Sequence, residues 1–167
     1  EDGVCGMSTE KVKLGYKRTE VGVIPADWEV IKLGNLVDQN RTIRYGIVQP
    51  GLYEHSGRFM IRGQDYSKGW VDPSELFRVS ENIEKPFENA RVKTGDVLIT
   101  IVGANTGRIA IVPSWLDGAN LTQTTARIAT QSFRLNGDFC SHVLASPIGG
   151  KQVANFIKGA AQPGLNC

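Results

Sequence analysis

The strongest constraint on the fold is a pair of β-branched runs on either side of a loop that begins and ends with glycine. Residues 97–102 read Val-Leu-Ile-Thr-Ile-Val after a turn at Gly95-Asp96, and residues 108–112 read Arg-Ile-Ala-Ile-Val. β-Branched residues favour strands, whereas glycine favours the tight turns between them. The sequence therefore predicts a β-hairpin over residues 92–112, with its turn at 103–107.

Further extended segments are expected in the first half of the chain. Residues 22–34 are expected to form an anchoring strand that ends in a turn at Gly34, with Trp28, Val30 and Leu33 packed on one side. Residues 57–63 form a short apolar run bounded by glycines, and the turn-forming residues 64–69 predict a loop after it. A loop is also expected over 46–51, which ends in Pro-Gly.

A short helix is expected over residues 81–89. Ser80 is a candidate N-cap for this helix, because a serine hydroxyl can accept a hydrogen bond from a free backbone N–H of the first turn. Pro86 can be accommodated only in a first turn or at a break, so the helix is expected to be irregular there. A β-like run at 124–128 follows later in the chain.

Two more helices are expected near the C-terminus. Asn136 begins the first, in which Phe139, Val143 and Leu144 stand at helical spacing. The second is expected to carry an apolar face and to end at a glycine; the residues concerned are Val153, Phe156, Ile157 and Gly159. The predicted fold class is α+β, a mixed and strand-rich domain with short helices toward the C-terminus.

The chain has the length of one domain, 167 residues. Residues 1–14 are expected to be a leader or a disordered N-terminus, since the first six precede Met7 and have no pattern, and residues 15–167 to form a single domain. No apolar run approaches the roughly 18 residues that span a bilayer, and nothing resembles a secretion signal, so we expect a soluble cytoplasmic protein with no membrane partner. Three distant cysteines favour reduced thiols over a disulfide or a metal site; they are Cys5, Cys140 and Cys167.

The sequence predicts no catalytic and no metal-binding residues. The loop 103–107 lacks the lysine and the length of a phosphate-binding loop, and it lies between two strands rather than between a strand and a helix. His55 and His142 have no sequence neighbours that would make either a catalytic base. The glutamates of the helix expected over 81–89 are better interpreted as a solvated face than as metal ligands.

Charge alone does not identify a partner. The net charge is +2, residues 71–90 are acidic, and seven basic residues stand against three acidic ones from Arg91 to the C-terminus. A mildly basic surface and an ordinary solvated surface both remain open.

Four motifs together resemble the target-recognition domain of type I restriction-modification specificity subunits. They are GVIPADWEVIKLG at 22–34, RVKTGDVLIT at 91–100, GANTGRIAIVP at 103–113 and KGAAQPGLN at 158–166. The resemblance implies an N-terminal recognition domain, truncated before the long spacer helix of the family, that binds one half of a bipartite double-stranded DNA target and itself holds no cofactor. It also implies a methyltransferase subunit that modifies adenine with S-adenosylmethionine, and a restriction and translocase subunit that uses ATP and Mg²⁺.

The residues that read DNA are expected in the loops rather than in the framework. In the resemblance, Gly95, Asp96, Gly103, Gly107 and Pro113 match framework positions and set turn geometry. The candidate DNA-binding residues have side chains that hydrogen-bond phosphates or base edges. They are Arg41, Arg44, Tyr45, Arg62, Gln64, Tyr66, Ser67, Lys68, Asn105, Thr106, Arg108, Gln123, Thr124 and Thr125.

Two other functions remain open at this point. The domain can instead be a protein-interaction module that docks the methyltransferase subunit while DNA contacts are made elsewhere. A small carbohydrate- or nucleotide-binding β domain would need an aromatic-lined pocket, and the scattered Trp28, Trp70 and Trp115 are better interpreted as core or rim packing.

Overall fold

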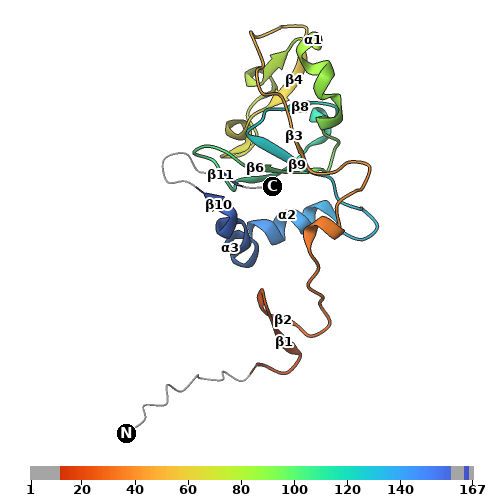
Figure 1. Ribbon diagram of the computed structural model, residues 1–167, viewed down its shortest axis with the longest axis vertical. Coiled ribbons are helices and arrows are strands. Elements are labelled where there is room, and N and C mark those ends of the chain that lie inside the picture. Colours follow the sequence, from red (N-terminus) through yellow and green to blue (C-terminus); the bar gives the residue numbers. More distant parts are fainter. Residues whose placement is uncertain (1–11, 159–163, 166–167) are drawn as a thin grey trace. The chain divides into compact units, whose positions relative to one another are not determined.

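The computed structural model describes residues 12–158, 164 and 165, with side chains up to residue 154 (Figure 1). The chain divides into two compact units between Lys32 and Leu33, and each is described by itself. Residues 1–11 of the expected leader and Gly159, the expected end of the last helix, lie outside the described residues.

The first unit is a β-hairpin. Strand β1 (Tyr16–Thr19) pairs antiparallel with β2 (Gly22–Pro25), and the Thr19 hydroxyl donates to the Gly22 carbonyl at 2.8 Å across the turn. The strand expected over 22–34 is therefore too long, because Pro25 ends it and a turn follows at residues 26 and 27. The expected packing of Trp28 and Val30 is also wrong, since these side chains are 48% and 39% exposed.

The second unit contains a four-stranded antiparallel sheet with strand order β3-β9-β6-β7. Its strands are β3 (Arg44–Tyr45), β6 (Val97–Thr100), β7 (Ile109–Ile111) and β9 (Thr125–Ile128). The hairpin expected over 92–112 is confirmed, because Val97 pairs with Ile111 and Ile99 with Ile109. Gly95, at a φ of +84°, makes the turn that leads into β6.

A second sheet has strand order β5-β4-β8. Strand β4 (Arg58–Ile61), which confirms the strand expected over 57–63, pairs antiparallel with β5 (Phe77–Val79) and parallel with β8 (Asn120–Leu121). The loop expected at 64–69 is in part a 3₁₀ helix, η2 (Gly63–Tyr66). The loop expected at 46–51 is confirmed, except that Ile47 is buried and bridges to Thr122.

Short helices connect the strands. Helix α1 (Glu81–Glu84) continues into the 3₁₀ helix η4 (Lys85–Ala90), so the helix expected over 81–89 changes type just before Pro86. Ser80 stands at the N-cap, but its side chain makes no capping hydrogen bond there. The remaining 3₁₀ turns are η1 (Leu33–Asn35), which contains Gly34, η3 (Pro73–Glu75) and η5 (Ser114–Leu116).

The two helices expected near the C-terminus are α2 (Gly137–Ala145) and α3 (Pro147–Phe156). The Asn136 side chain accepts a hydrogen bond from the Phe139 N–H at 3.1 Å and caps α2, as expected. Ile157 was expected in the last helix but lies in β10 (Ile157–Lys158), which pairs with β11 (Gly164–Leu165). The fold class is α+β, as the sequence predicts.

The face of α2 that packs on the sheet differs from the expected one. Cys140 and Leu144, one helical turn apart, pack against the core cluster that contains Val97 and Ile99 of β6. Phe139 and Val143 remain 48% and 37% exposed. Of the three residues expected on the apolar face, only Leu144 packs there, and Cys140, four residues before it on the same face, was missed.

Strand β6 is the centre of the second unit. Val97 and Ile99 point to the cluster under α2, whereas Leu98 belongs to the cluster between the two sheets, with Ile61 and Leu121. Successive side chains of a strand alternate between faces, so β6 is covered on both. The run of consecutive apolar residues that predicted the hairpin reflects this two-sided burial.

Candidate functional site

The strand directions bring four loop segments to one end of the sheets. Strands β3 and β6 both run antiparallel to β9, so they run parallel to each other, and both end where β9 begins at Thr125. Strand β4, parallel to β8, ends beside the turn that joins β8 to β9. We call this region, made of residues 45–47, 61–68, 100–108 and 122–125, the loop end.

Main-chain hydrogen bonds join the four segments of the loop end. The Thr122 carbonyl accepts from the Gly46 N–H at 3.1 Å, and the Thr122 N–H donates to the Ile61 carbonyl at 3.1 Å. On the other side of the turn, the Ile101 N–H donates to the Thr124 carbonyl at 2.8 Å. The loop end is thus one continuous structure built on the turn at 122–125.

Most of the candidate DNA-binding residues lie at the loop end, and Arg41 does not. Arg41 precedes β3, and its guanidinium makes two hydrogen bonds, at 2.9 and 2.5 Å, to the buried carboxylate of Asp96, which precedes β6. Both residues stand before their strands, so the pair lies at the opposite end of the sheet. Asp96 also accepts the Lys93 N–H at 2.7 Å, which shows that Arg41 supports a turn.

Several candidates at the loop end have partners within the protein. Arg62 forms an ion pair with Asp65 at 2.8 Å, and Tyr66 is buried with its hydroxyl 2.7 Å from the Thr100 hydroxyl oxygen. Burial raises the pKa of Tyr66, so the phenol stays neutral and can donate. Other candidates with internal contacts or full burial are Ser67, Thr106, Thr124 and Thr125.

The remaining candidates have side chains that reach solvent. Tyr45 is 56% exposed on the edge strand β3, and Asn105 is partly exposed in the loop between β6 and β7. The other exposed candidates are Arg44, which lies on β3 just before the loop end, and Gln64, Lys68, Arg108 and Gln123. These side chains have the donors and acceptors that contact phosphates and base edges.

The electrostatic character of this region is positive. Together with the neighbouring Arg44, its segments carry four cations, and Asp65 is the one carboxylate in them. Because Asp65 is 1% exposed and paired with Arg62, its charge is neutralised inside the protein. The exposed charge therefore comes from Arg44, Lys68 and Arg108.

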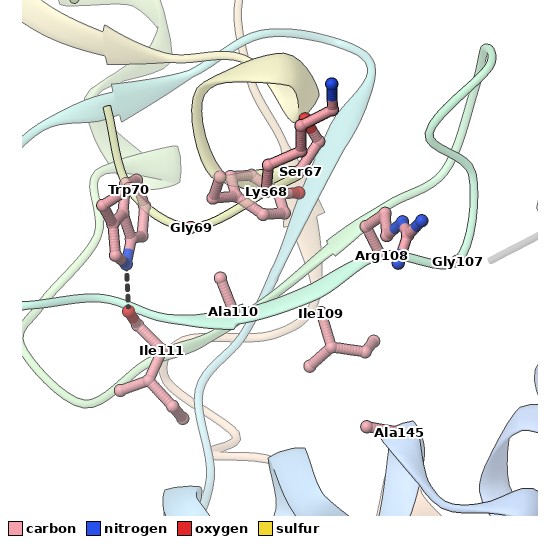
Figure 2. Close-up of a pocket in the computed structure, with 11 residues that line it drawn as sticks. Ser67, Lys68, Gly69, Trp70, Gly107, Arg108, Ile109, Ala110, Ile111 and Ala145 are labelled. Atoms are coloured by element: carbon pink, nitrogen blue, oxygen red, sulfur yellow. Dashed lines mark hydrogen bonds between the residues drawn. The ribbon is translucent and has the colours of Figure 1, made fainter. Parts of the chain in front are cut away.

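A cavity of about 570 Å³ extends from the loop end along β7. Lys68 and Arg108 line it, and no carboxylate is among the described residues that line it. Figure 2 shows Arg108 at the start of β7 and Trp70 near its other end, where the indole N–H donates to the Ile111 carbonyl at 3.2 Å. Trp70 was expected only to pack in the core or at its rim. In the sequence it directly follows the candidate loop at 64–69, and this was the one indication that it lies beside the site.

Two kinds of feature were not found within the described part of the chain. No group of three or more His, Cys, Asp or Glu residues there is arranged to hold a metal ion. No helix among those residues is long and apolar enough to cross a membrane.

The sequence matches specificity subunits of type I restriction enzymes. It is 33% identical over 158 residues, 95% of this chain, to the EcoBI specificity subunit of Escherichia coli. It is 25% identical over 158 residues, 89% of this chain, to the MjaVIII specificity subunit of Methanocaldococcus jannaschii. These matches relate the chain to the type I specificity subunits and confirm the resemblance that its four motifs indicated.

The chain spans about a third of the length of these relatives, 32% and 35% respectively. No family model matches it. Among solved structures, it is similar to the S subunit of a type I restriction-modification system from M. genitalium, with a TM-score of 0.47 and 12% identity over 80% of this chain and 30% of that one.

Proposed function

We propose that this chain is a DNA target-recognition domain, and that its loop end reads one half of a bipartite sequence. The observation that carries the proposal is the convergence of three separate segments, each containing candidate residues, on the turn at 122–125, which contains further candidates. The names of the relatives support the role, since both are specificity subunits of type I restriction enzymes.

The exposed side chains of the loop end divide into two chemical groups. Lys68 and Arg108, beside the cavity along β7, are suited to phosphates, which attract cations regardless of sequence. Tyr45 on the edge strand β3 and Gln123 in the turn at 122–125 present a hydroxyl and an amide to solvent, and such groups can read base edges. Phosphate contacts would then place the domain on the duplex, and the polar side chains would select the sequence.

The chemistry is proposed to belong to partner subunits. A methyltransferase subunit would modify adenine with S-adenosylmethionine, and a restriction and translocase subunit would use ATP and Mg²⁺. One recognition module buries only about 600–1,000 Å² of protein surface on DNA, so this half alone is expected to bind weakly.

The test is a map of methylated adenines. The full-length protein that contains this chain is expressed with its methyltransferase subunit, and modified adenines are mapped across a genome. Residues 44–68 are then exchanged for the matching segment of a relative, which is expected to change one half of the target and leave the other half unchanged. Unchanged methylation after the exchange, or the absence of any defined target before it, would refute the proposal.

A second candidate function is docking of the methyltransferase subunit. The exposed apolar side chains of Val143 on α2 and Ile148 on α3, 37% and 41% exposed, favour it. Substituting Ile148→Glu is expected to reduce co-purification with the methyltransferase while leaving direct DNA binding intact, if docking is a separate role of this domain. If the wild type and Ile148→Glu co-purify equally with the methyltransferase subunit, the docking function is refuted.

A further inference from the structure

We propose that Gln64 reads one base pair of the target, and that the pair Arg62–Asp65 and the bond between Tyr66 and Thr100 hold it in position. This inference rests on the proposed function and assigns a specificity-determining residue within it. Gln64 lies in η2, a 3₁₀ turn at the loop end.

The turn is closed on one side by a buried carboxylate. Asp65 accepts the Arg62 backbone N–H at 2.8 Å and the Arg62 guanidinium at 2.8 and 3.1 Å. The same guanidinium reaches the Glu75 carbonyl at 3.3 Å. Burying a carboxylate is costly unless it is paired and hydrogen-bonded, and here one pair meets that requirement and fixes the shape of the turn.

The turn is closed on its other side by the end of β6. The buried Tyr66 hydroxyl lies 2.7 Å from the Thr100 hydroxyl oxygen. Gly63 also approaches Thr100 closely, since a Cβ built at Gly63 would lie 2.7 Å from its side chain. Gln64 therefore stands between Gly63, which lies close to Thr100, and Tyr66, which is hydrogen-bonded to Thr100.

Gln64 itself is exposed, and its side chain has no structural task among the described contacts. The main-chain carbonyl of Gln64 accepts a hydrogen bond from the Ser67 hydroxyl at 3.1 Å, and this bond fixes the main chain there. Every other polar side chain from Arg62 to Ser67 has a partner within the protein. The amide is thus presented on a rigid base, which reduces the conformational entropy that binding must remove.

The chemistry of the amide matches one base pair in particular. A glutamine side chain has a donor and an acceptor side by side, and adenine presents an acceptor at N7 and a donor at N6 in the major groove. A good bidentate contact of this kind discriminates against the wrong base by about 5- to 150-fold. The Gln64 side chain would therefore favour adenine at one base pair of the target.

The experiment uses the full-length protein with its methyltransferase subunit and the target that the methylation map defines. Binding is measured by competition with duplexes substituted at each position in turn, for the wild type, Gln64→Ala and Gln64→Glu. The matched control is Gln152→Ala, an exposed glutamine on α3, outside the loop end.

Gln64→Ala is expected to reduce the preference for adenine at one base pair of the target by about 5- to 150-fold. Its preferences at the other base pairs are expected to stay as in the wild type. Gln64→Glu is expected to shift that position toward cytosine, whose N4 amine donates to a carboxylate. Unchanged preference at every position, or an equal loss of affinity for all duplexes, would overturn the assignment of Gln64. A wild type without any sequence preference would instead overturn the proposed function.

The positioning role has its own variant. Thr100→Val keeps the volume of the side chain and removes the hydroxyl that Tyr66 contacts, while Thr94→Val removes an exposed hydroxyl that binds Asp117. Thr100→Val is expected to relax preference at the same base position as Gln64→Ala, and Thr94→Val is not. A uniform loss of affinity in Thr100→Val would show that Thr100 supports the fold without positioning Gln64.

Discussion

Glu84, one of the glutamates expected on a solvated face, is instead a fully buried carboxylate at the centre of a polar network. Its neutralisation is expected to destabilise the domain. Its two oxygens accept hydrogen bonds from the Arg91 guanidinium at 2.6 and 2.7 Å, and Oε1 also accepts from the Asn120 amide at 2.8 Å. The Arg58 guanidinium lies 3.4 Å away. The network joins α1 to β8 and β4, so the substitution Glu84→Gln tests a contact between distant segments.

The magnitude follows from the number of contacts that glutamine can keep. Its oxygen can still accept from Arg91 and Asn120, but its amide N–H₂ would face a second donor of Arg91. A hydrogen bond to a charged group contributes about 1.5–3 kcal/mol, and removing one partner of a buried pair costs about 3–5 kcal/mol. Because the Arg91 side chain is 32% exposed and water can reach it, we expect about 3 kcal/mol, or roughly 10 °C in Tm.

The effect of Glu84 depends on pH. Hydrogen bonds from Arg91 hold the pKa of Glu84 below its ordinary value of 4.5 in the folded protein. A group with a lowered folded pKa contributes stability that is present above its unfolded pKa and is lost as the pH falls through the folded pKa. The difference between wild type and Glu84→Gln is therefore largest near neutral pH and shrinks below pH 4.5.

The assay is urea denaturation of this chain at pH 7 and at pH 3, with Glu88→Gln as the matched control. Glu88 lies 4.0 Å from Arg91, but its side chain is 64% exposed, and exposed ion pairs contribute about 0–1 kcal/mol. Equal losses in the two variants, or a Glu84→Gln difference as large at pH 3 as at pH 7, would refute the reasoning.

Three further predictions concern the loop end and the core. Arg108→Ala is expected to lower the slope of log DNA affinity against log salt concentration by about one unit. The control Lys151→Ala, which removes an exposed cation on α3, is expected to leave this slope unchanged. Gly63→Ala is expected to cost roughly 1–3 kcal/mol in urea denaturation, because its Cβ would lie 2.7 Å from the buried Thr100. Burial raises the pKa of Cys140 to about 11, so alkylation followed by mass spectrometry at pH 8.5 should find this thiol roughly a hundredfold less reactive than in the urea-unfolded chain.

The elements that were predictable from the sequence are those determined by short-range pattern. The β6–β7 hairpin follows from its β-branched runs and glycine turn, and α2 from the cap at Asn136, because partners in both lie close in sequence. The α2 face was misjudged, since periodicity alone allows two adjacent faces and only the position of β6 decides between them. The exposure of Trp28 was also missed, because the strand expected around it ends at Pro25.

The roles of charged residues depend on long-range contacts and were less predictable. Arg41 belongs to a basic, loop-like stretch, yet it pairs with Asp96, which lies 55 residues away in sequence. Arg62 and Asp65 are close neighbours, and the i,i+3 spacing that makes their turn rigid is visible in the sequence. That this rigid turn also positions Gln64 could not be predicted from the sequence, because it depends on the hydrogen bond between Tyr66 and Thr100 at the end of β6.

The way in which the loop end is assembled bears on how the proposed DNA specificity would change. Its segments are joined by main-chain hydrogen bonds around Thr122, so the fold constrains the backbone there more than the exposed side chains. Gln64, Gln123 and Tyr45 can therefore be substituted at little cost in stability, because replacing an exposed side chain leaves those bonds intact. A domain with a fixed frame and replaceable surface side chains is suited to recognising different sequences, and this predicts that changes of target will separate from changes of stability.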